Sequence, residues 1–500
     1  MSATVTAPAA DHGAVPSALA GPEVHETHTG FVVLVGDRAY KVKKPILTDF
    51  LDFRTVEARE RVCAHEVLLN SRLAPDGYLG VGHFAGPRGE ADEPVIVMRR
   101  YPEDRRLASL IRHGEPVEQH LSAIAELLAR FHAGACRSSA VDADARAGVL
   151  LERWNENLDV LGHYAGSILP APRLAEVQRL ARQYLLGRAP LFASRIDGRR
   201  IVDGHGDLIA DDIFCMPAGP VLLDCLEFDD HLRHLDGLDD AAFLAMDLDY
   251  LGRPDLAATF LNDYRRVAGD SAPGSLAHFY VAYRAVVRAK VDCIRVDQGQ
   301  ATAADDAQRH LSLAVEHLRA ATVRMVIVGG GPGTGKTTLA RELAERIGAV
   351  VLSTDDVRVE LVASGELAGE AGKFGSGLYD PTNVSIVYDT VVKRAGTLLA
   401  NGQSVILDGT WRDARQRQRA YVIADELSCP TVELACQLDI RQAVERIDRR
   451  GAATHTQATE DVAQRMHADE PTWDSAHHID TSRALGDSVD EAVAVCCLAI

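Results

Sequence analysis

GGPGTGKT, at Gly330–Thr337, decides the fold of the carboxyl-terminal part of this chain. It follows the apolar run Met325–Val328 and precedes a helical pattern, so its glycines stand at a strand-to-helix turn. Glycine lets the backbone curl until successive N–H groups face one phosphate, while Lys336 adds a positive charge near the β- and γ-phosphates and Thr337 offers a hydroxyl to Mg²⁺. The sequence therefore predicts a P-loop that binds ATP and Mg²⁺. The residues expected to contact the nucleotide are Gly330, Gly331, Gly333, Thr334, Gly335, Lys336, Thr337 and Thr338.

Beyond residue 322 the pattern alternates short apolar strands with helices. The predicted strands are Met325–Gly329, Val350–Leu352, Val405–Leu407 and Val432–Leu438, and the predicted helices are Thr337–Ile347 and Val384–Leu399. Such βαβ repetition is typical of a parallel sheet with helices on both faces. We therefore place a domain boundary near residue 322 and expect an α/β P-loop domain with a parallel sheet over 323–500.

Two aspartates follow strands of this predicted sheet. Asp355 comes after Val350–Ser353, and Asp408 comes after Val405–Leu407. Open α/β sheets bind ligands at the carboxyl ends of their strands, and phosphoryl transfer needs both a metal-binding carboxylate and a base for the acceptor hydroxyl. We expect Asp408 to orient Mg²⁺ and Asp355 to be the base. A helix cap for Asp355 and a turn carboxylate for Asp408 are the alternatives.

A cluster of arginines precedes Gly451. Arg446, Arg449 and Arg450 lie in a helical segment, and residues 452–460 have the composition of a mobile lid. Arginines there could close over the transferring phosphoryl group and balance its charge, whereas a solvated helix face is the alternative.

The order of these motifs resembles a known group of kinases. GxxxxGKT, TDDVR, LDGTWRDARQR and ERIDRRG follow one another as in the zeta-toxin, gluconate-kinase and polynucleotide-kinase group of P-loop kinases. The resemblance implies a kinase in which Asp355 is the base, Lys336 contacts the transferred group and Arg450 is the lid arginine.

A second phosphate-handling signature lies in the middle of the chain. Protein-kinase-like enzymes need a catalytic-loop Asp, a metal-binding residue five positions on, and a second metal-binding Asp after a nearby strand. Asp207, Asp212 and Asp224 fill these positions. The segments HGDLIADDIF and VLLDCLEFDD resemble the aminoglycoside phosphotransferase family, whose usual pattern is HGDxxxxN. Asp212 stands where that family has Asn, which adds negative charge beside Asp224.

The segments around this motif support an α+β bilobal protein-kinase-like domain over 23–322. A hairpin at 31–43, a helix at 56–73 and a strand at 95–98 are predicted first, followed by helices near 117–134, 173–187, 254–267, 276–296 and 305–322. The stretch YKVKKP resembles the family's nucleotide-lysine strand. This resemblance makes Lys43 the candidate for the α- and β-phosphates and Glu66 its partner, with Lys41 on the same face as the alternative.

The composition is that of an ordinary soluble globular protein, with 47% apolar and 25% charged residues. A formal charge of −19 and 5% aromatic residues argue against a broad surface for nucleic acid or anionic lipid. Nine cysteines show neither a CxxC pair nor any His/Cys metal spacing, which favours the reducing cytoplasm. Residues 1–22 lack a basic start and an apolar core, so they read as a disordered tail, and no run approaches a membrane span.

The leading interpretation is a tandem phosphotransferase with two nucleotide sites. The whole arrangement resembles bacterial fusions of an aminoglycoside phosphotransferase-like domain with a kinase or ATPase domain. Each domain would use ATP and Mg²⁺ to phosphorylate a hydroxyl group of a small molecule. Two alternatives stay open: a nucleotide-binding regulatory pseudokinase fused to an active P-loop kinase, and a polynucleotide 5′-hydroxyl kinase. The sequence specifies neither substrates nor the oligomeric state.

Overall fold

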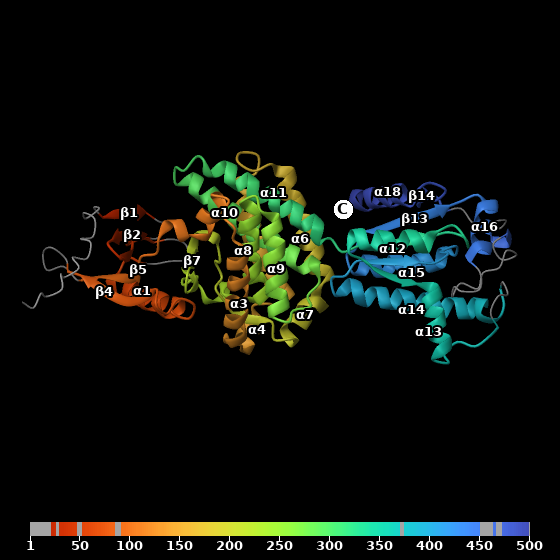
Figure 1. The fold of residues 1–500 in the computed structure, drawn as a ribbon, viewed down its shortest axis with the longest axis horizontal. Helices are drawn as coiled ribbons and strands as arrows, with labels where there is room; N and C mark the ends of the chain where they lie inside the picture. Colours follow the sequence, from red (N-terminus) through yellow and green to blue (C-terminus); the bar gives the residue numbers. More distant parts are fainter. Residues whose placement is uncertain are drawn as a thin grey trace, which may run out of the picture. The chain divides into compact units, whose positions relative to one another are not determined.

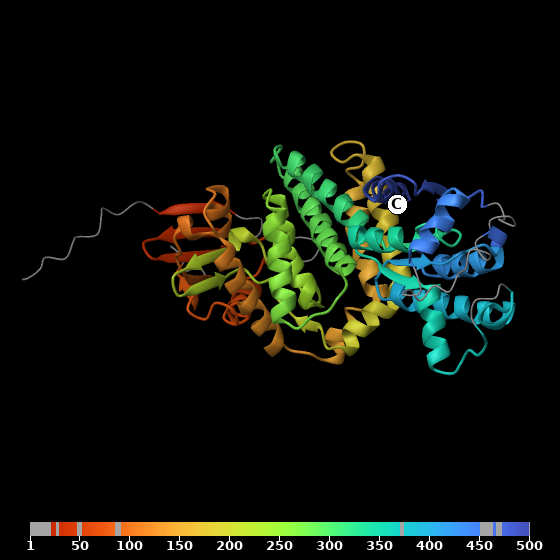
Figure 2. The ribbon, with the colours of Figure 1, turned by 45° about the vertical axis from the view of Figure 1, so that its right-hand side comes forward.

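The computed structural model describes residues 22–26, 30–47, 53–85, 92–370, 375–450, 464–466 and 473–499. The predicted tail, apart from its last residue, and the predicted lid at 452–460 lie outside these ranges. The chain forms two compact units, residues 1–120 with 210–230 and residues 121–209 with 231–500. Figures 1 and 2 trace the chain through both units by colour. No helix in the described ranges has the length and apolarity needed to cross a bilayer.

The first unit is built on an antiparallel sheet of five strands in the order β1-β2-β3-β5-β4. Its strands are β1 (Glu23–Glu26), β2 (Gly30–Val35), β3 (Arg38–Lys43), β4 (Tyr78–Phe84) and β5 (Glu93–Arg99). Helix α1 (Val56–Asn70) packs on β4 and β5, and Thr55 caps it by accepting the N–H of Ala58. Burial alternates along β3, so Lys41 and Lys43 share its buried face. The predicted hairpin, helix and strand are confirmed, whereas β1 and β4 are additional.

A short hairpin completes the described sheet structure of this unit. Strand β7 (Ile213–Met216) pairs with β8 (Gly219–Leu222) in antiparallel fashion. Helix α2 (Leu107–Arg112) packs against β7. The hairpin joins the predicted metal-binding positions before and after it.

The second unit begins with helices. They are α3 (Glu118–Gly134), which starts in the first unit, α4 (Ser139–Ala143), α5 (Ala147–Gly162), α6 (Ala171–Gly187), α7 (Ala189–Asp197), α8 (Gly237–Tyr250), α9 (Pro254–Val267), α10 (Gly274–Asp297) and α11 (Ala303–Ala321). A two-stranded ribbon of β6 (Ile201–Asp203) and β9 (His234–Asp236) lies among them in the sequence. The predicted helices near 117–134, 173–187, 254–267, 276–296 and 305–322 are confirmed within a few residues.

The chain changes to an α/β pattern after α11, near the predicted boundary at 322. Five parallel strands stand in the order β11-β12-β10-β13-β14. They are β10 (Met325–Gly329), β11 (Val350–Ser353), β12 (Val405–Asp408), β13 (Thr431–Gln437) and β14 (His477–Asp480). The predicted parallel sheet is confirmed, and with it the fold class. The boundary itself stays a prediction, because the two compact units divide the chain elsewhere.

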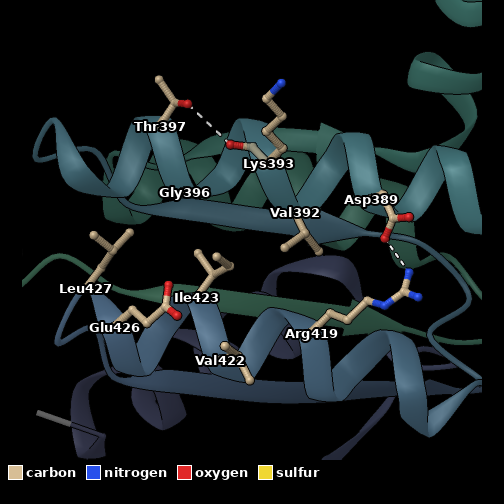
Figure 3. A pocket seen from close by; sticks show the side chains of 10 residues that line it. All are labelled: Asp389, Val392, Lys393, Gly396, Thr397, Arg419, Val422, Ile423, Glu426 and Leu427. Carbon is tan, nitrogen blue, oxygen red and sulfur yellow. Dashed lines mark hydrogen bonds and ion pairs between the residues drawn. The ribbon is translucent and has the colours of Figure 1, made fainter.

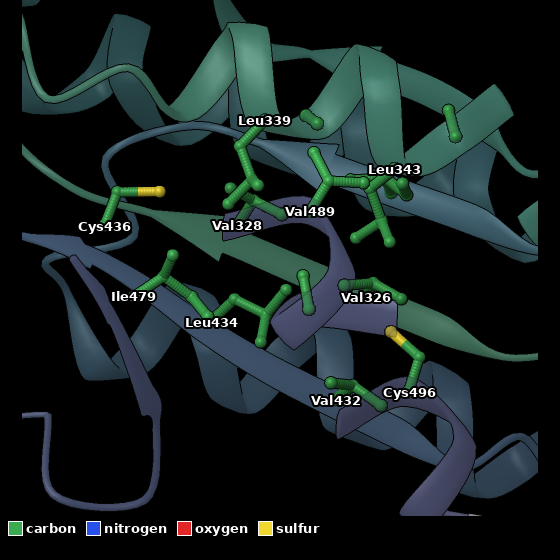
Figure 4. Close-up of a cluster of buried hydrophobic side chains, with 14 residues drawn as sticks. Val326, Val328, Leu339, Leu343, Val432, Leu434, Cys436, Ile479, Val489 and Cys496 are labelled. Carbon is green, nitrogen blue, oxygen red and sulfur yellow. The ribbon is translucent and has the colours of Figure 1, made fainter. Parts of the chain in front are cut away.

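Helices cover both faces of this sheet. Helices α12 (Lys336–Ile347) and α18 (Leu485–Leu498) lie on one face, and α14 (Pro381–Ala400) and α15 (Ala414–Glu426) lie on the other (Figure 1). The first face carries a core in which Leu339 and Leu343 of α12 meet Val328 and Leu434 of the strands and Val489 of α18 (Figure 4). Burying each such side chain contributes roughly 1.5–3 kcal/mol, so this core fixes α12 against the central strand. The start of α12 is thereby held at the end of β10.

Candidate functional site

The phosphate loop has a backbone that only glycine adopts easily. Gly330, Gly333 and Gly335 have φ angles of 145°, 80° and 86°. A Cβ at Gly333 would lie 2.4 Å from the carbonyl oxygen of Ala443, so a side chain is excluded there by space as well as by conformation. Gly335 is the N-cap of α12. A curled glycine loop that leads into a helix amino terminus is the arrangement that binds phosphate.

The loop is braced from β14. Thr334 Oγ1 donates a hydrogen bond to the carbonyl oxygen of Gly331 at 2.9 Å, and Thr481 Oγ1 donates to the carbonyl oxygen of Thr334 at 2.6 Å. Arg446 Nη2 donates to the carbonyl oxygen of Thr481 at 2.8 Å. Thr481 was not predicted from the sequence, since it lies far from the motif along the chain.

The predicted metal-binding pair is assembled beside the loop. The sheet register sets Asp408 level with Val328 on one side and Ser353 on the other, at the carboxyl ends of the strands. Thr337 Oγ1 donates to Asp408 Oδ2 at 2.8 Å. Asp408 is only 2% exposed, and its Oδ1 has no hydrogen-bond partner among the described residues. A buried carboxylate oxygen without a partner, next to a threonine hydroxyl, fits a hard cation such as Mg²⁺.

The electrostatics of Asp408 agree with this assignment. Burial raises the pKa of its carboxyl group, while Lys336 and the hydrogen bond from Thr337 act in the opposite direction. Repulsion by Asp355 adds to the rise in pKa, so the two carboxylates lie within electrostatic reach of each other. A cation between the loop and these carboxylates would relieve both the burial cost and the repulsion.

Asp355 lies in the first turn of α13 (Thr354–Ala363) and is not its cap. The cap is Ser353, whose Oγ accepts the N–H of Asp355 at 3.2 Å. The Asp355 carboxylate instead pairs with Arg358 Nη1 at 2.5 Å. The Arg358 guanidinium is buried and lies 4.7 Å from the ring centroid of Tyr379. Asp355 therefore does not cap the helix, and its role as base stays a prediction.

The predicted lid arginines differ in their surroundings. Arg446 lies beside the loop, since a Cβ on Gly335 would be 3.2 Å from Arg446 Nη1. Arg449 pairs with the exposed Glu445 at 3.3 Å along α16 (Ile440–Arg450). The side chain of Arg450 lies outside the described residues, so its lid role stays a prediction.

A strained residue fixes the segment after Asp408. Trp411 is fully buried with φ of 49°, and its Nε1 donates to the carbonyl oxygen of Leu407 at 2.9 Å. Its backbone N–H donates to the hydroxyl of Tyr388 at 3.2 Å. Arg417 Nη1 donates to the Trp411 carbonyl at 2.6 Å. The sequence signal that could have singled out Trp411 is a tryptophan three residues after the polar strand end at Asp408.

A cavity of about 450 Å³ opens beside the loop. Its lining includes Gly331, Pro332, Thr334, Arg412 and the start of α16. A larger groove of about 640 Å³ lies between α14 and α15, where Val392 faces Val422 and Ile423 (Figure 3). The groove contains no residue of the loop, whereas the smaller cavity borders the loop at Gly331, Pro332 and Thr334.

In the first unit, both lysines of β3 meet the same carboxylate. Lys41 Nζ lies 2.7 Å from Glu66 Oε1, and Lys43 Nζ lies 2.6 Å from Glu66 Oε2. Only Lys41 also contacts Asp224, at 2.5 Å, whereas Lys43 contacts Glu227 at 2.6 Å. Burial alone would lower the pKa of Lys41, but Asp224 and Glu66 outweigh it and raise that pKa above its usual value. The expected Lys43–Glu66 contact is present, but Lys41 shares it.

The hairpin β7–β8 brings the two predicted metal-binding aspartates together. Its register pairs Ile213 with Leu222, and the N–H of Leu223 donates to the carbonyl oxygen of Asp212 at 3.0 Å. Leu223 therefore lies across from Asp212, and Asp224 is the next residue along the chain. Asp224 has a φ of 62°, which is uncommon for a residue with a side chain, and its N–H donates to the hydroxyl of Tyr78 at 3.2 Å. Backbone strain of this kind clusters at functional sites.

In the second unit, a buried carboxylate holds the loop that carries Asp207. Asp240, on α8, accepts the backbone N–H of His205 at 2.7 Å and that of Gly206 at 2.9 Å. His132 Nε2 lies 2.9 Å from the same carboxylate. These hydrogen bonds favour the ionised form and hold the pKa of Asp240 well below its usual value, although burial opposes them.

The peptide of Gly206 is held from both sides. Arg284 Nη1 donates to its carbonyl oxygen at 3.3 Å, and Arg284 also pairs with Asp239 at 2.7 Å. Gly206 has φ of 85°, and the N–H of Asp207 donates to His205 Nδ1 at 3.3 Å. His205 therefore braces the loop through its ring nitrogen. Sequence reasoning missed Asp240, His132 and Arg284, although an Asp-Asp pair inside an apolar helix was a usable signal.

Comparisons with known proteins identify the carboxyl-terminal domain and the family of the whole chain. Residues 325–470 match the AAA_33 family, described as an AAA domain. The carboxyl-terminal part is therefore a P-loop domain, as the sequence predicts. The chain is 50% identical over 470 residues to Uncharacterized protein Rv2004c of Mycobacterium tuberculosis, covering 94% of each protein. It belongs to the family of this protein and of Mb2027c from Mycobacterium bovis, which has the same identity and coverage.

Two kinases are also similar to parts of the chain. Adenylate kinase from a Synechococcus species is 33% identical over 124 residues, which are 24% of this chain and 66% of that protein. The crystal structure of a choline/ethanolamine kinase family protein from Mesorhizobium loti covers 59% of this chain and 93% of its own, with 16% identity and a TM-score of 0.36.

Proposed function

We propose that this protein is an ATP-dependent kinase whose P-loop domain transfers the terminal phosphoryl group of ATP to a hydroxyl group of a small molecule. The contact between Thr337 and Asp408, with its unpartnered carboxylate oxygen beside the glycine loop, carries the proposal. The similarity to adenylate kinase supports a kinase rather than a hydrolase. The pair of Asp355 and Arg358 supports an acceptor site past the end of β11.

The residues divide the work by position. The glycine loop and Lys336 bind the β- and γ-phosphates, and Thr337 and Asp408 hold Mg²⁺, which supplies charge neutralisation when bound. Arg446 lies beside Gly335 and adds positive charge near the loop. Asp355 orients the acceptor hydroxyl and takes its proton as the oxygen attacks phosphorus and the bond to the leaving ADP breaks. Positioning and charge balance account for catalysis without a covalent intermediate.

We further propose a second nucleotide site in the first unit, with Lys41 rather than Lys43 on the phosphates. Lys41 contacts Asp224, one of the two expected metal-binding residues, while Lys43 is fully buried between Glu66 and Glu227. Asp212 supplies a second acidic ligand, so this site has a higher negative charge than the family's usual Asn gives. The competing regulatory function is favoured by the same excess charge, because added negative charge beside Asp224 and the phosphates weakens catalysis.

The two lysines should respond differently to substitution. We expect Lys41→Ala to weaken nucleotide binding about 10–100-fold, because a charge-assisted contact to phosphate is lost. Lys43→Ala should instead destabilise the first unit by about 3–5 kcal/mol, because it removes the buried ammonium group that pairs with the carboxylates of Glu66 and Glu227. Both are measured in a Lys336→Ala background, by titration with a fluorescent ATP analogue and by urea denaturation. The reverse pattern would return the phosphate role to Lys43.

The proposed function is tested by ADP release. Sugars, aminoglycosides, nucleosides and a 5′-hydroxyl oligonucleotide are offered to the wild type and to Asp355→Asn and Asp207→Asn. Loss of a general base lowers the rate about 10²–10⁴-fold, so Asp355→Asn should lose the activity of the P-loop domain and Asp207→Asn any activity that depends on the His205–Asp207 loop. An Asp207→Asn protein with every activity intact would support the regulatory alternative. A wild type that neither binds ATP nor releases ADP with any acceptor would refute the proposal.

A further inference from the structure

Three side chains from two segments of the second unit converge on one point. Asp144 follows α4, and His231 and His234 stand three residues apart at and before β9. His231 Nδ1 lies 2.9 Å from Asp144 Oδ2, and His234 Nδ1 lies 2.6 Å from the same oxygen. The three ligand-type atoms all lie within 4.8 Å of one another. Two imidazole nitrogens and a carboxylate oxygen are therefore gathered at one point, and a cation would replace the protons that the nitrogens share with the carboxylate.

The frame around these side chains is fixed by Arg153. Its Nη2 donates to the carbonyl oxygen of His231 at 2.6 Å, and its Nη1 lies 3.4 Å from that of His234. The same guanidinium lies 3.9 Å from Asp144 Oδ1, the carboxylate oxygen that does not face the rings. Arg153 thus positions both histidine backbones and orients the carboxylate, as residues behind metal ligands do.

We propose that Asp144, His231 and His234 form a binding site for a zinc-like divalent cation. Two imidazole nitrogens and one carboxylate oxygen are ligands that zinc prefers, and nitrogen ligands disfavour Mg²⁺. The His231 side chain is 74% exposed, so water can fill a fourth position. Metal–ligand bonds of about 2.0–2.1 Å in a tetrahedron separate the donor atoms by roughly 3.3 Å, so on binding the carboxylate oxygen would move away from both nitrogens, and all three donor atoms already lie within 4.8 Å of one another.

The site adjoins the segment that leads into the Asp207 loop. His234 pairs with Asp203 across the β6–β9 ribbon, and Arg233 Nε donates to Asp203 Oδ1 at 2.9 Å. The N–H of Gly204 donates to the carbonyl oxygen of Arg233 at 2.9 Å. A cation that ties β9 to the end of α4 would therefore also restrain the residues just before the loop. Binding should raise the melting temperature of the protein.

The test is zinc titration of the full-length protein after removal of metals with a chelator. Affinity is measured by competition with a chromophoric chelator for the wild type, His231→Ala, Asp144→Asn and the control His163→Ala, which replaces another exposed histidine. Because His231 is exposed, its loss leaves the fold intact. Removing a residue that binds the metal directly should weaken zinc binding by more than the roughly 10–100-fold typical of residues that only support the ligands. The control should keep wild-type affinity. Equal affinity in wild type and His231→Ala would overturn the proposal.

Cobalt gives an independent readout. Co²⁺ in the wild type should show the visible absorption of a site with nitrogen ligands, which disappears in His231→Ala and persists in His163→Ala. Millimolar Mg²⁺ should not displace the bound ion. A cobalt spectrum that is unchanged in His231→Ala, or ready displacement by Mg²⁺, would show that the three residues are only an ion-pair cluster.

Discussion

Replacing Lys336 by alanine lowers acceptor-dependent ATP turnover by about 10²–10³-fold, the loss expected when one charged group is removed from a preorganised phosphate site. Lys336 is the first residue of α12, directly after the curled loop. Its charge reaches Asp408, whose pKa it lowers against the effect of burial. The glycine backbone that shapes the loop does not depend on this side chain, so the protein keeps its fold. ADP release at saturating ATP measures the effect.

A matched control is available in the same domain. Lys393 is an exposed lysine of α14 that lines the groove away from the phosphate loop (Figure 3). Lys393→Ala should leave turnover unchanged, and both variants should melt within a few degrees of wild type. Full activity in Lys336→Ala, or equal losses of turnover in the two variants, would show that the phosphate loop takes no part in the reaction.

The second large effect is expected at Asp240. Its replacement by alanine leaves the N–H groups of His205 and Gly206 buried without an acceptor. It also removes the hydrogen-bond partner of His132 Nε2. Losing one side of a buried, hydrogen-bonded charge costs about 3–5 kcal/mol. Amide hydrogen exchange of peptides that span 201–209 measures the local loss of protection, and thermal melting measures the global one.

The control and the conservative variant sharpen this test. Asp255→Ala removes an exposed aspartate of α9 and should leave the stability of the protein nearly unchanged. Asp240→Asn keeps the shape and one carbonyl oxygen, so it should retain part of the protection. Exchange at 201–209 that is as slow in Asp240→Ala as in wild type would show that the loop does not rely on this carboxylate.

The P-loop half of the molecule could be predicted closely from the sequence. Strands β10, β11 and β12 are short apolar runs rich in β-branched residues that end at glycine or a polar residue, and parallel strands place these ends at one edge, whereas β14 (HHID) lacks this pattern and was missed. The approach of Thr337 to Asp408 follows from that rule and is observed at 2.8 Å. Helix α8 was missed for the opposite reason. Gly237–Tyr250 is buried on nearly all sides, so it lacks the polar stripe by which helical periodicity is recognised.

The partners of the central motif could not be predicted, because they are brought together only by the tertiary fold. His132 lies 108 residues from Asp240, and Asp144 lies 87 residues from His231. The spacing of His231 and His234 also did not predict a metal site, since two histidines without a third ligand nearby in the sequence are not typical of one. The period of β3 placed Lys41 and Lys43 on one face, but only the β7–β8 hairpin decides which of them meets Asp224.

The peptide held between Asp240 and Arg284 has a consequence for evolution and engineering. Its shape is set while the chain folds, so under the proposed phosphotransferase function an acceptor molecule would not have to bear the entropy of ordering that turn. The pocket residues that select the acceptor could then be substituted during evolution while the turn stays unchanged. A library that randomises pocket-lining positions and spares Gly204, Gly206, Asp240 and Arg284 should retain far more folded members than one that includes them.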